Sequence, residues 1–116
     1  MAHYAAKLAI FGSSIRLIPP RPDVQPGWHL CGVLIDFDAI GITRRELMTR
    51  LANKGIGSQV HYIPVNLQPF YRAKGAADLP GARAYYSRAL SLPLFATMTI
   101  ADVDRVVGAL SESLAA

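Results

Sequence analysis

The chain has 116 residues, of which 52% are apolar and 17% are charged, and its net charge is +4. This length suits a single domain, and the apolar share excludes an intrinsically disordered chain. No apolar run approaches the roughly 20 residues of a membrane helix, so we expect no membrane partner.

The first 27 residues predict an N-terminal helix, a short strand and a proline-rich linker. The apolar residues with helical spacing are Tyr4, Leu8 and Phe11. A Gly-Ser-Ser sequence stops this helix, and residues 15–18 then alternate like a strand. Four prolines interrupt regular structure over residues 19–27, because proline lacks an amide proton and fixes φ. We therefore divide the chain into this segment, residues 1–27, and a small compact domain, residues 28–116.

Residues 28–37 form the clearest predicted strand. They are rich in Leu, Val and Ile, and this near-continuous apolar character predicts burial on both faces of a sheet. Cys31 is the only cysteine, so the chain cannot form an internal disulfide. The N-terminus also shows no secretory signal, and both observations favour a reducing compartment. We expect a cytoplasmic location.

A helix with a well-marked start follows this strand. Thr43 and Glu46 have the spacing of a capping box, in which the hydroxyl and the carboxylate each accept a hydrogen bond from the other residue's amide. Lys54 in the last turn and Gly55 after it suit the end of the helix. Residues 56–62 then predict a second strand.

The second half of the chain predicts several short elements and a longer final helix. They are a loop over 63–69, a helical turn over 69–74, a helix from Asp78 through Leu90, an edge strand over 91–95 and a helix capped by Thr99. Because strands and helices are mixed along the chain, we expect an α/β (α+β) fold. It would contain a small three- to four-stranded sheet packed by helices.

The positive charge is concentrated in residues 44–88, which carry eight basic side chains against Glu46 and Asp78. Two interpretations stay open, a solvated helical face or a surface that binds an anion such as phosphate. No basic run alternates with aromatic residues, and no helix-turn-helix or zinc-finger motif occurs. We therefore expect no nucleic-acid partner.

Polar side chains suited to ligand recognition gather in residues 55–72, directly after and within the predicted second strand. They include an imidazole, two phenols, two amides and a guanidinium. Loops that follow strands are common ligand sites in α/β proteins. The residue types alone leave two interpretations open, a recognition loop or a proline-rich loop packed over the core. No metal site is expected, because His3, His29 and His61 lie far apart and no Cys-x-x-Cys pair occurs.

Three motifs in this half resemble a known family. They are Gly-Ile-Gly-x-Gln-Val-His-Tyr-Ile-Pro-Val-x-Leu-Gln-Pro-x-Tyr-Arg at 55–72, Ala-Tyr-Tyr at 84–86 and Leu-Ser-Leu-Pro-Leu-Phe at 90–95. Together with Trp28-His29-Leu30, they are similar to the C-terminal small domain of the DegT/DnrJ/StrS sugar aminotransferases, over residues 4–114. The subtype that the chain most resembles makes UDP-4-amino-4,6-dideoxy-N-acetyl-altrosamine, an intermediate towards pseudaminic acid.

The resemblance implies a fold-type I, pyridoxal-phosphate-dependent enzyme, usually a homodimer. Such enzymes commonly transfer an amino group from glutamate to a keto-sugar nucleotide in cell-surface polysaccharide biosynthesis. A large N-terminal domain carries the cofactor lysine, and the small C-terminal domain closes over the site. By this resemblance His61 and Tyr62 match substrate-side positions, with Gln68 and Tyr71 in the same loop. The implied ligand is a UDP-sugar-like molecule.

The family's lysine motif does not occur in this chain. Lys7, Lys54 and Lys74 fall in the N-terminal segment, at a helix end and in a polar loop, where no buried Schiff-base site is expected. We therefore expect no catalytic residue, no cofactor-binding residue and no metal ligand here, and no activity in the chain alone.

Two roles are compatible with a chain that resembles only the small domain. The first is a stand-alone or truncated C-terminal domain: a truncated reading frame, a remnant, or half of a split enzyme whose partner is a separate pyridoxal-phosphate-binding domain. The second is a non-catalytic binding or assembly module. It would pair with that separate domain, or with itself through exposed apolar surface.

The isolated chain is expected to form no specific aldimine with pyridoxal phosphate, because a Schiff-base site needs a positioned lysine and a phosphate cradle. Incubation with the cofactor, borohydride reduction and peptide mass mapping should find no lysine modified stoichiometrically. A full-length member of the family, treated alike, is the positive control. A visible absorbance band that saturates at one equivalent and disappears on reduction would contradict this expectation.

Overall fold

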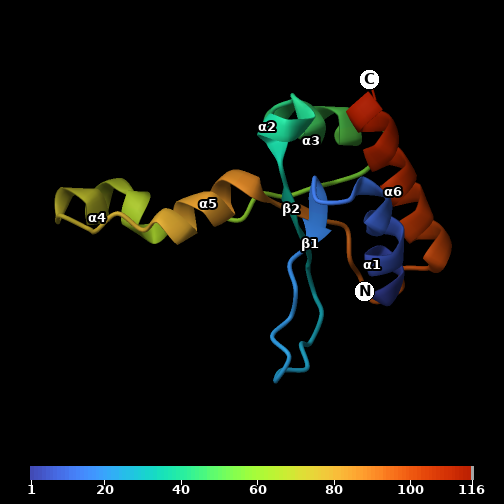
Figure 1. Cartoon of the computed structure of the whole chain (residues 1–116), viewed down its shortest axis with the longest axis horizontal. Helices are drawn as coiled ribbons and strands as arrows, with labels where there is room; N and C mark the ends of the chain where they lie inside the picture. Colours follow the sequence, from blue (N-terminus) through green and yellow to red (C-terminus); the bar gives the residue numbers. More distant parts are fainter. Residues whose placement is uncertain (116) are drawn as a thin grey trace.

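The computed structural model describes residues 1–115 and consists of a small sheet, helices and a protruding arm (Figure 1). Its elements in chain order are α1 (Ala2–Leu8), the 3-10 turn η1 (Ala9–Phe11), β1 (Ile15–Leu17), β2 (Cys31–Ile35), α2 (Phe37–Ile40), α3 (Arg44–Asn53), the 3-10 turn η2 (Val65–Leu67), α4 (Pro69–Ala73), α5 (Pro80–Arg88), β3 (Ala89–Leu92) and α6 (Ile100–Ala115). The mixed α/β class is confirmed. None of the helices described has the length and hydropathy needed to cross a membrane.

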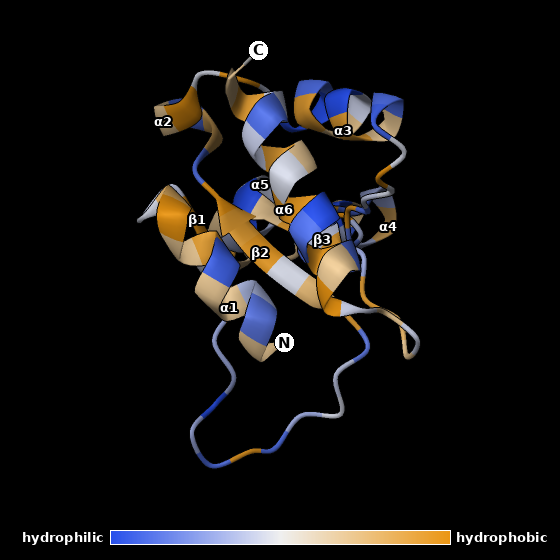
Figure 2. Ribbon diagram, turned by 90° about the vertical axis from the view of Figure 1, so that its right-hand side faces the viewer, coloured by the Kyte–Doolittle hydropathy of each residue, from blue (hydrophilic) through white to orange (hydrophobic). Residues whose placement is uncertain are grey.

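The sheet has three strands in the order β1-β2-β3, and both outer strands run antiparallel to β2. Burial alternates along β2: Cys31, Val33 and Ile35 are fully buried, whereas Gly32 and Leu34 are half-buried. The prediction of burial on both faces is therefore wrong for the face of Gly32 and Leu34. The physical reason is that α1 and α6 both cover the opposite face (Figure 2). Burial also raises the pKa of the Cys31 thiol to about 11, so the thiol stays protonated at neutral pH.

The helices α1 and α6 lie side by side across one face of the sheet, and α3 packs against α6 (Figure 2). On α6 the apolar residues Val103, Val106 and Leu110 recur at helical spacing, and all three are buried. Tyr4 of α1 is also fully buried, and its hydroxyl donates to the carbonyl of Pro93 at 2.8 Å. This bond connects the first helix to the segment that follows β3.

Both predicted helix caps are present. Thr43 Oγ1 accepts from the Glu46 amide at 3.2 Å, and the Glu46 carboxylate accepts from the Thr43 amide at 2.7 Å. Thr99 and Asp102 exchange the same two bonds at 3.2 and 2.8 Å. These hydrogen bonds from the threonines lower the pKa of both carboxyls. A lowered pKa means that the caps stabilise the fold at neutral pH and that this contribution is lost as the pH falls through the folded-state values.

The strand predicted over residues 56–62 is absent, and that prediction was wrong. Only Gln59 pairs with β3, through two backbone hydrogen bonds with Ser91 at 2.9 and 3.1 Å. The segment meets the edge of the sheet at this single point, because Ile56 turns into the core and Tyr62, 83% exposed, already leaves the sheet. Its apolar residues therefore have no continuous partner strand.

The helix predicted to reach Leu90 ends earlier, at Arg88. Ala89 and Leu90 belong to β3, which stops before Pro93. Both residues favour helices in isolation, but pairing with β2 leaves them only 3% and 1% exposed. Burial in the sheet thus outweighs local helix propensity.

The strand predicted over residues 28–37 is shorter at both ends. Trp28, His29 and Leu30 lie outside β2, because the chain opposite contains Pro19 and Pro20, which lack the amide protons a ladder needs. At the other end the chain turns into α2, a short helix that was not predicted from the sequence. The boundary predicted at residue 27 lies in the loop between these two paired strands, and that division stays a prediction.

An arm, residues 62–88, extends away from the sheet along the longest dimension of the molecule, which measures 48 × 37 × 25 Å (Figure 1). It contains η2, α4 and α5, none of which has a fully buried residue. The large apolar side chains that it exposes are Tyr62, Ile63, Val65, Phe70, Tyr71, Leu79 and Tyr85. The arm thus exposes many apolar side chains, and it packs against the body of the domain at its base, where α5 contacts β2.

Leu110→Ala is expected to lower the free energy of unfolding by about 2–5 kcal/mol, because it leaves a cavity where α6 meets the sheet. Leu110 is fully buried, whereas Ile100 on the same helix is 65% exposed. The matched variant Ile100→Ala should stay within about 0.5 kcal/mol of the wild type in a urea titration. Equal losses in the two variants would contradict the packing of α6 described above.

Candidate functional site

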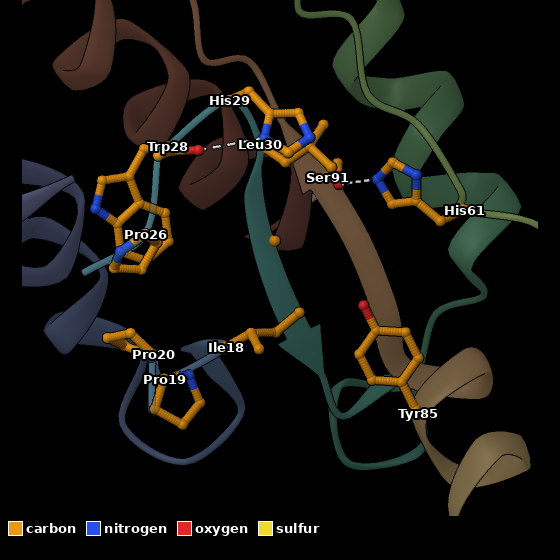
Figure 3. A pocket seen from close by; sticks show the side chains of 12 residues that line it. Ile18, Pro19, Pro20, Pro26, Trp28, His29, Leu30, His61, Tyr85 and Ser91 are labelled. Carbon is orange, nitrogen blue, oxygen red and sulfur yellow. Dashed lines mark hydrogen bonds between the residues drawn. The ribbon is translucent and has the colours of Figure 1, made fainter. Parts of the chain in front are cut away.

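A cavity of about 310 Å³ opens on the face of the sheet opposite α1 and α6 (Figure 3). We call it the outer cavity. Its lining residues are Ile18, Pro19, Pro20, Pro26, Gly27, Trp28, His29, Leu30, Gly32, His61, Tyr85 and Ser91. They come from the β1–β2 loop (residues 18–30), the outer face of β2 and β3, the segment before the arm (residues 56–61), and α5. This volume is at the lower end of the range for small-molecule sites.

The floor of the outer cavity depends on a glycine in the central strand. Ile18 continues the ladder beyond β1, since its amide donates to the carbonyl of Gly32 at 3.0 Å. A Cβ at position 32 would lie 2.7 Å from Ile18 Cδ1. Glycine at this position therefore lets Ile18 lie flat on the sheet. The prolines of the loop and Trp28 lie beside Ile18 and form an apolar wall of the cavity.

Two histidines, His29 and His61, line the outer cavity. The Nε2 atom of His61 is hydrogen-bonded to Ser91 Oγ, and the side chains point toward each other in Figure 3. His29 Nδ1 lies 3.4 Å from the carbonyl of Gly27, at the limit of a hydrogen bond. A second cavity of about 320 Å³ shares His29, Leu30 and Ser91 with the outer cavity. Ser91 thus contributes to the lining of both.

Two arginines hold the base of the arm and so position Tyr85 at the cavity. From α3, Arg44 donates to the carbonyls of Tyr86 and Ala89 and lies 4.7 Å from the centre of the Tyr86 ring. From α5, Arg88 forms a 3.1 Å ion pair with Asp36, where β2 passes into α2. The C-terminal end of α5 is therefore fixed from two directions, while the rest of the arm is exposed.

Of the four predicted site residues, only His61 lines the outer cavity. Tyr62 points into solvent at the start of the arm, and Gln68 is exposed before α4. Tyr71 is 44% exposed on α4, where its ring packs edge-to-face on Phe70 at 5.3 Å. The structure does not bring these three to the cavity, and their role as substrate contacts stays a prediction.

Three residues that line the cavity have no role predicted from the sequence. They are Trp28, Tyr85 and Ser91. Each lies in a motif on which the family resemblance rests, and this membership was the one sequence signal that could have identified them as site residues. Their common location could not be deduced from the sequence, because they come from three separate segments that meet only through the pairing of the sheet.

The lysines of this chain do not fit a pyridoxal-phosphate site. Lys7 forms an ion pair with Asp104 at 3.0 Å on the surface, and Lys54 forms one with Glu112 at 2.6 Å. Lys74 lies over the ring of Phe70 on the arm. None of the three lines the outer cavity, and no cluster of three potential metal ligands occurs in the part of the chain that the structure describes.

Comparison with known proteins connects this fold to one family. The model of the DegT/DnrJ/EryC1/StrS aminotransferase family matches residues 1–111. The chain is 40% identical over 102 residues to the spore coat polysaccharide biosynthesis protein SpsC of Bacillus subtilis, a match that covers 83% of this chain and 26% of SpsC.

Solved structures give the same result. The structure of S. venezuelae DesV in complex with a ketimine intermediate is 33% identical, with a TM-score of 0.80 over 97% of this chain and 29% of DesV. DesI, in the presence of its TDP-sugar product, is 26% identical, with a TM-score of 0.83 over 97% of this chain and 29% of DesI. The chain thus spans less than a third of the length of these relatives.

Arg44→Ala is expected to loosen the base of the arm, because the carbonyls of Tyr86 and Ala89 lose a charged donor. Hydrogen bonds to charged groups contribute about 1.5–3 kcal/mol, so amide exchange and proteolysis within residues 62–88 should rise several-fold. Arg45→Ala is the matched control, since Arg45 is exposed and none of the hydrogen bonds described involves its side chain. Equal protease sensitivity in the two variants would show that Arg44 does not anchor the arm.

Proposed function

The chain belongs to the DegT/DnrJ/EryC1/StrS aminotransferase family, and we propose that it acts as the small C-terminal domain of a pyridoxal-phosphate-dependent sugar-nucleotide aminotransferase. One observation carries this proposal: almost the whole chain matches family members of which it covers only 26–29%. The lysine that forms the Schiff base with the cofactor would then lie on a domain outside these residues. The lysines present here lie on the surface, away from the cavity.

The residues of this chain would act on the substrate side. His61 sits at the rim of the outer cavity with one ring nitrogen bonded to Ser91, which leaves Nδ1 to bind a hydroxyl or phosphate oxygen. Tyr62, Gln68 and Tyr71 lie on the exposed arm, where they would reach a ligand only once the arm meets the lysine-bearing domain. Arg72 and Lys74 on the arm would offset the negative charge of a diphosphate.

The substrate we propose is a UDP-linked keto-sugar, aminated at the expense of glutamate in a cytoplasmic step of cell-surface polysaccharide biosynthesis. Two relatives support this class: SpsC is a spore coat polysaccharide biosynthesis protein, and DesI was solved with a TDP-sugar product. The preference for UDP, and for the amino-sugar intermediate towards pseudaminic acid, rests on the motif at residues 55–72.

A mixing experiment tests the proposal. The purified chain is added to the separately produced large domain of SpsC, and amino transfer from glutamate is assayed on UDP- and TDP-linked keto-sugars. Activity is expected only when both chains are present. In the active mixture His61→Ala should reduce kcat/KM about tenfold or more, as expected for the loss of a hydrogen bond to a charged group.

The matched control is His3→Ala, which removes a histidine on α1 whose Nε2 bonds to Asp104, 2.8 Å away on the surface. This variant should keep wild-type activity. If the mixture binds both chains but shows no transfer, the catalytic proposal fails. Normal activity of His61→Ala would remove His61 from the substrate side.

A non-catalytic assembly module is the second candidate, and the arm is the observation that favours it. Tyr62, Ile63, Val65 and Phe70 are each more than half exposed, and together they offer an apolar surface for another protein. This role predicts that the chain self-associates, or binds the large domain, with no accompanying transfer. Analytical ultracentrifugation of the chain alone and of the mixture separates these outcomes.

A further inference from the structure

Ser91 is a polar residue in a strand that is otherwise apolar. It is 5% exposed, and its neighbours Leu90 and Leu92 are equally buried. A buried hydroxyl destabilises a fold unless it forms a hydrogen bond. Small apolar residues would fill this position without that cost. The presence of serine in β3 therefore calls for a physical reason, which its contacts supply.

Ser91 connects the segment before the arm to the sheet in two ways. Its backbone amide donates to the carbonyl of Gln59 at 2.9 Å, and its carbonyl accepts from the Gln59 amide at 3.1 Å. Its hydroxyl bonds to Nε2 of His61, two residues further along. Residues two apart in an extended chain point to the same side. One residue of β3 thus fixes both the backbone and the imidazole of this segment.

The hydroxyl reaches the imidazole because the neighbouring position of the sheet has no side chain. Ser91 pairs directly with Gly32, and residues that are directly opposed in an antiparallel pair share a face. That face is the floor of the outer cavity. Over residues 1–115 no hydrogen bond engages Nδ1 of His61, so the ring is held at Nε2 and open at Nδ1.

We propose that Ser91 is a positioning residue, which holds the His61 imidazole in one orientation at the rim of the outer cavity. The inference rests on the proposed substrate-side role of His61 for its functional meaning, but the orientation itself follows from the contacts above. Beyond residue 61 the chain leaves the sheet, and Tyr62 is almost fully exposed. Without the serine hydroxyl, the ring would rotate between staggered side-chain conformations.

Nuclear magnetic resonance of the histidine rings tests this proposal. In the wild-type chain, ring ¹⁵N shifts and three-bond couplings should report a single tautomer and a single χ1 conformation for His61. In Ser91→Ala the His61 signals should be averaged over both tautomers and over several χ1 conformations, while the ring signals of His3 and His29 stay unchanged. Ser91→Thr restores the hydroxyl and should restore the wild-type pattern, since the added methyl group has space in the cavity that Ser91 lines.

The matched control is Ser87→Ala, which removes a serine hydroxyl that donates to the Ala84 carbonyl at 3.0 Å on the exposed side of α5. This variant should leave the His61 signals unchanged. Slow exchange of the Gln59 amide in Ser91→Ala would show that the backbone pairing persists, so that any change in the ring comes from the hydroxyl. If Ser91→Ala does not fold, Ser91→Cys provides a weaker donor of similar size, and it should give intermediate averaging.

Transfer activity in the mixture with the SpsC large domain provides the second readout. Ser91→Ala should lower kcat/KM about three- to tenfold, less than His61→Ala, and Ser91→Thr should recover most of it. Unchanged ring signals in Ser91→Ala would overturn the positioning role and leave the proposed function standing. Averaged ring signals combined with full activity of His61→Ala would instead overturn the substrate-side role and leave the positioning intact.

Discussion

The antiparallel pairing of β2 with β3 is the contact on which the rest of the structure depends. It joins Val33 to Leu90 and Cys31 to Leu92, from opposite halves of the chain, and makes the buried surface on which α1 and α6 pack. Everything between these strands must leave the sheet and return to it. The chain does so through α3, which packs on α6, and through the arm, which contacts the body only at its base, where α5 meets β2.

The same pairing produces two unlike faces. One face is covered by helices and forms the core, whereas the other carries the outer cavity and the base of the arm (Figure 2). The arginines at positions 44 and 88 connect the end of α5 to α3 and to the end of β2. The outer cavity is therefore attached directly to the central strands, whereas the tip of the arm is exposed. This arrangement is the one expected for the proposed role, in which the small domain closes over a site on another domain.

Local signals were sufficient to predict much of the fold. The caps at Thr43 and Thr99 involve residues three positions apart, so the sequence pattern already contains both partners. The start of β3 and the absence of a strand at 56–62 depend instead on which distant segment supplies a partner. The candidate site shows the same contrast between local sequence signals and contacts between distant segments. His61 was recognised from a motif, whereas its bond to Ser91 joins residues 30 positions apart and appears only once the sheet is formed.

The β1–β2 loop has a consequence for the thermodynamics of binding. Its prolines at positions 19, 20 and 26 form much of the apolar wall of the outer cavity, and each has a fixed φ. A wall of this kind has little conformational entropy left to lose when a ligand arrives, because much of that loss occurred when the chain folded. A flexible loop of the same length would have to be ordered by the ligand itself. The cavity is therefore preorganised on its loop side, and the adaptable part of the domain is confined to the arm.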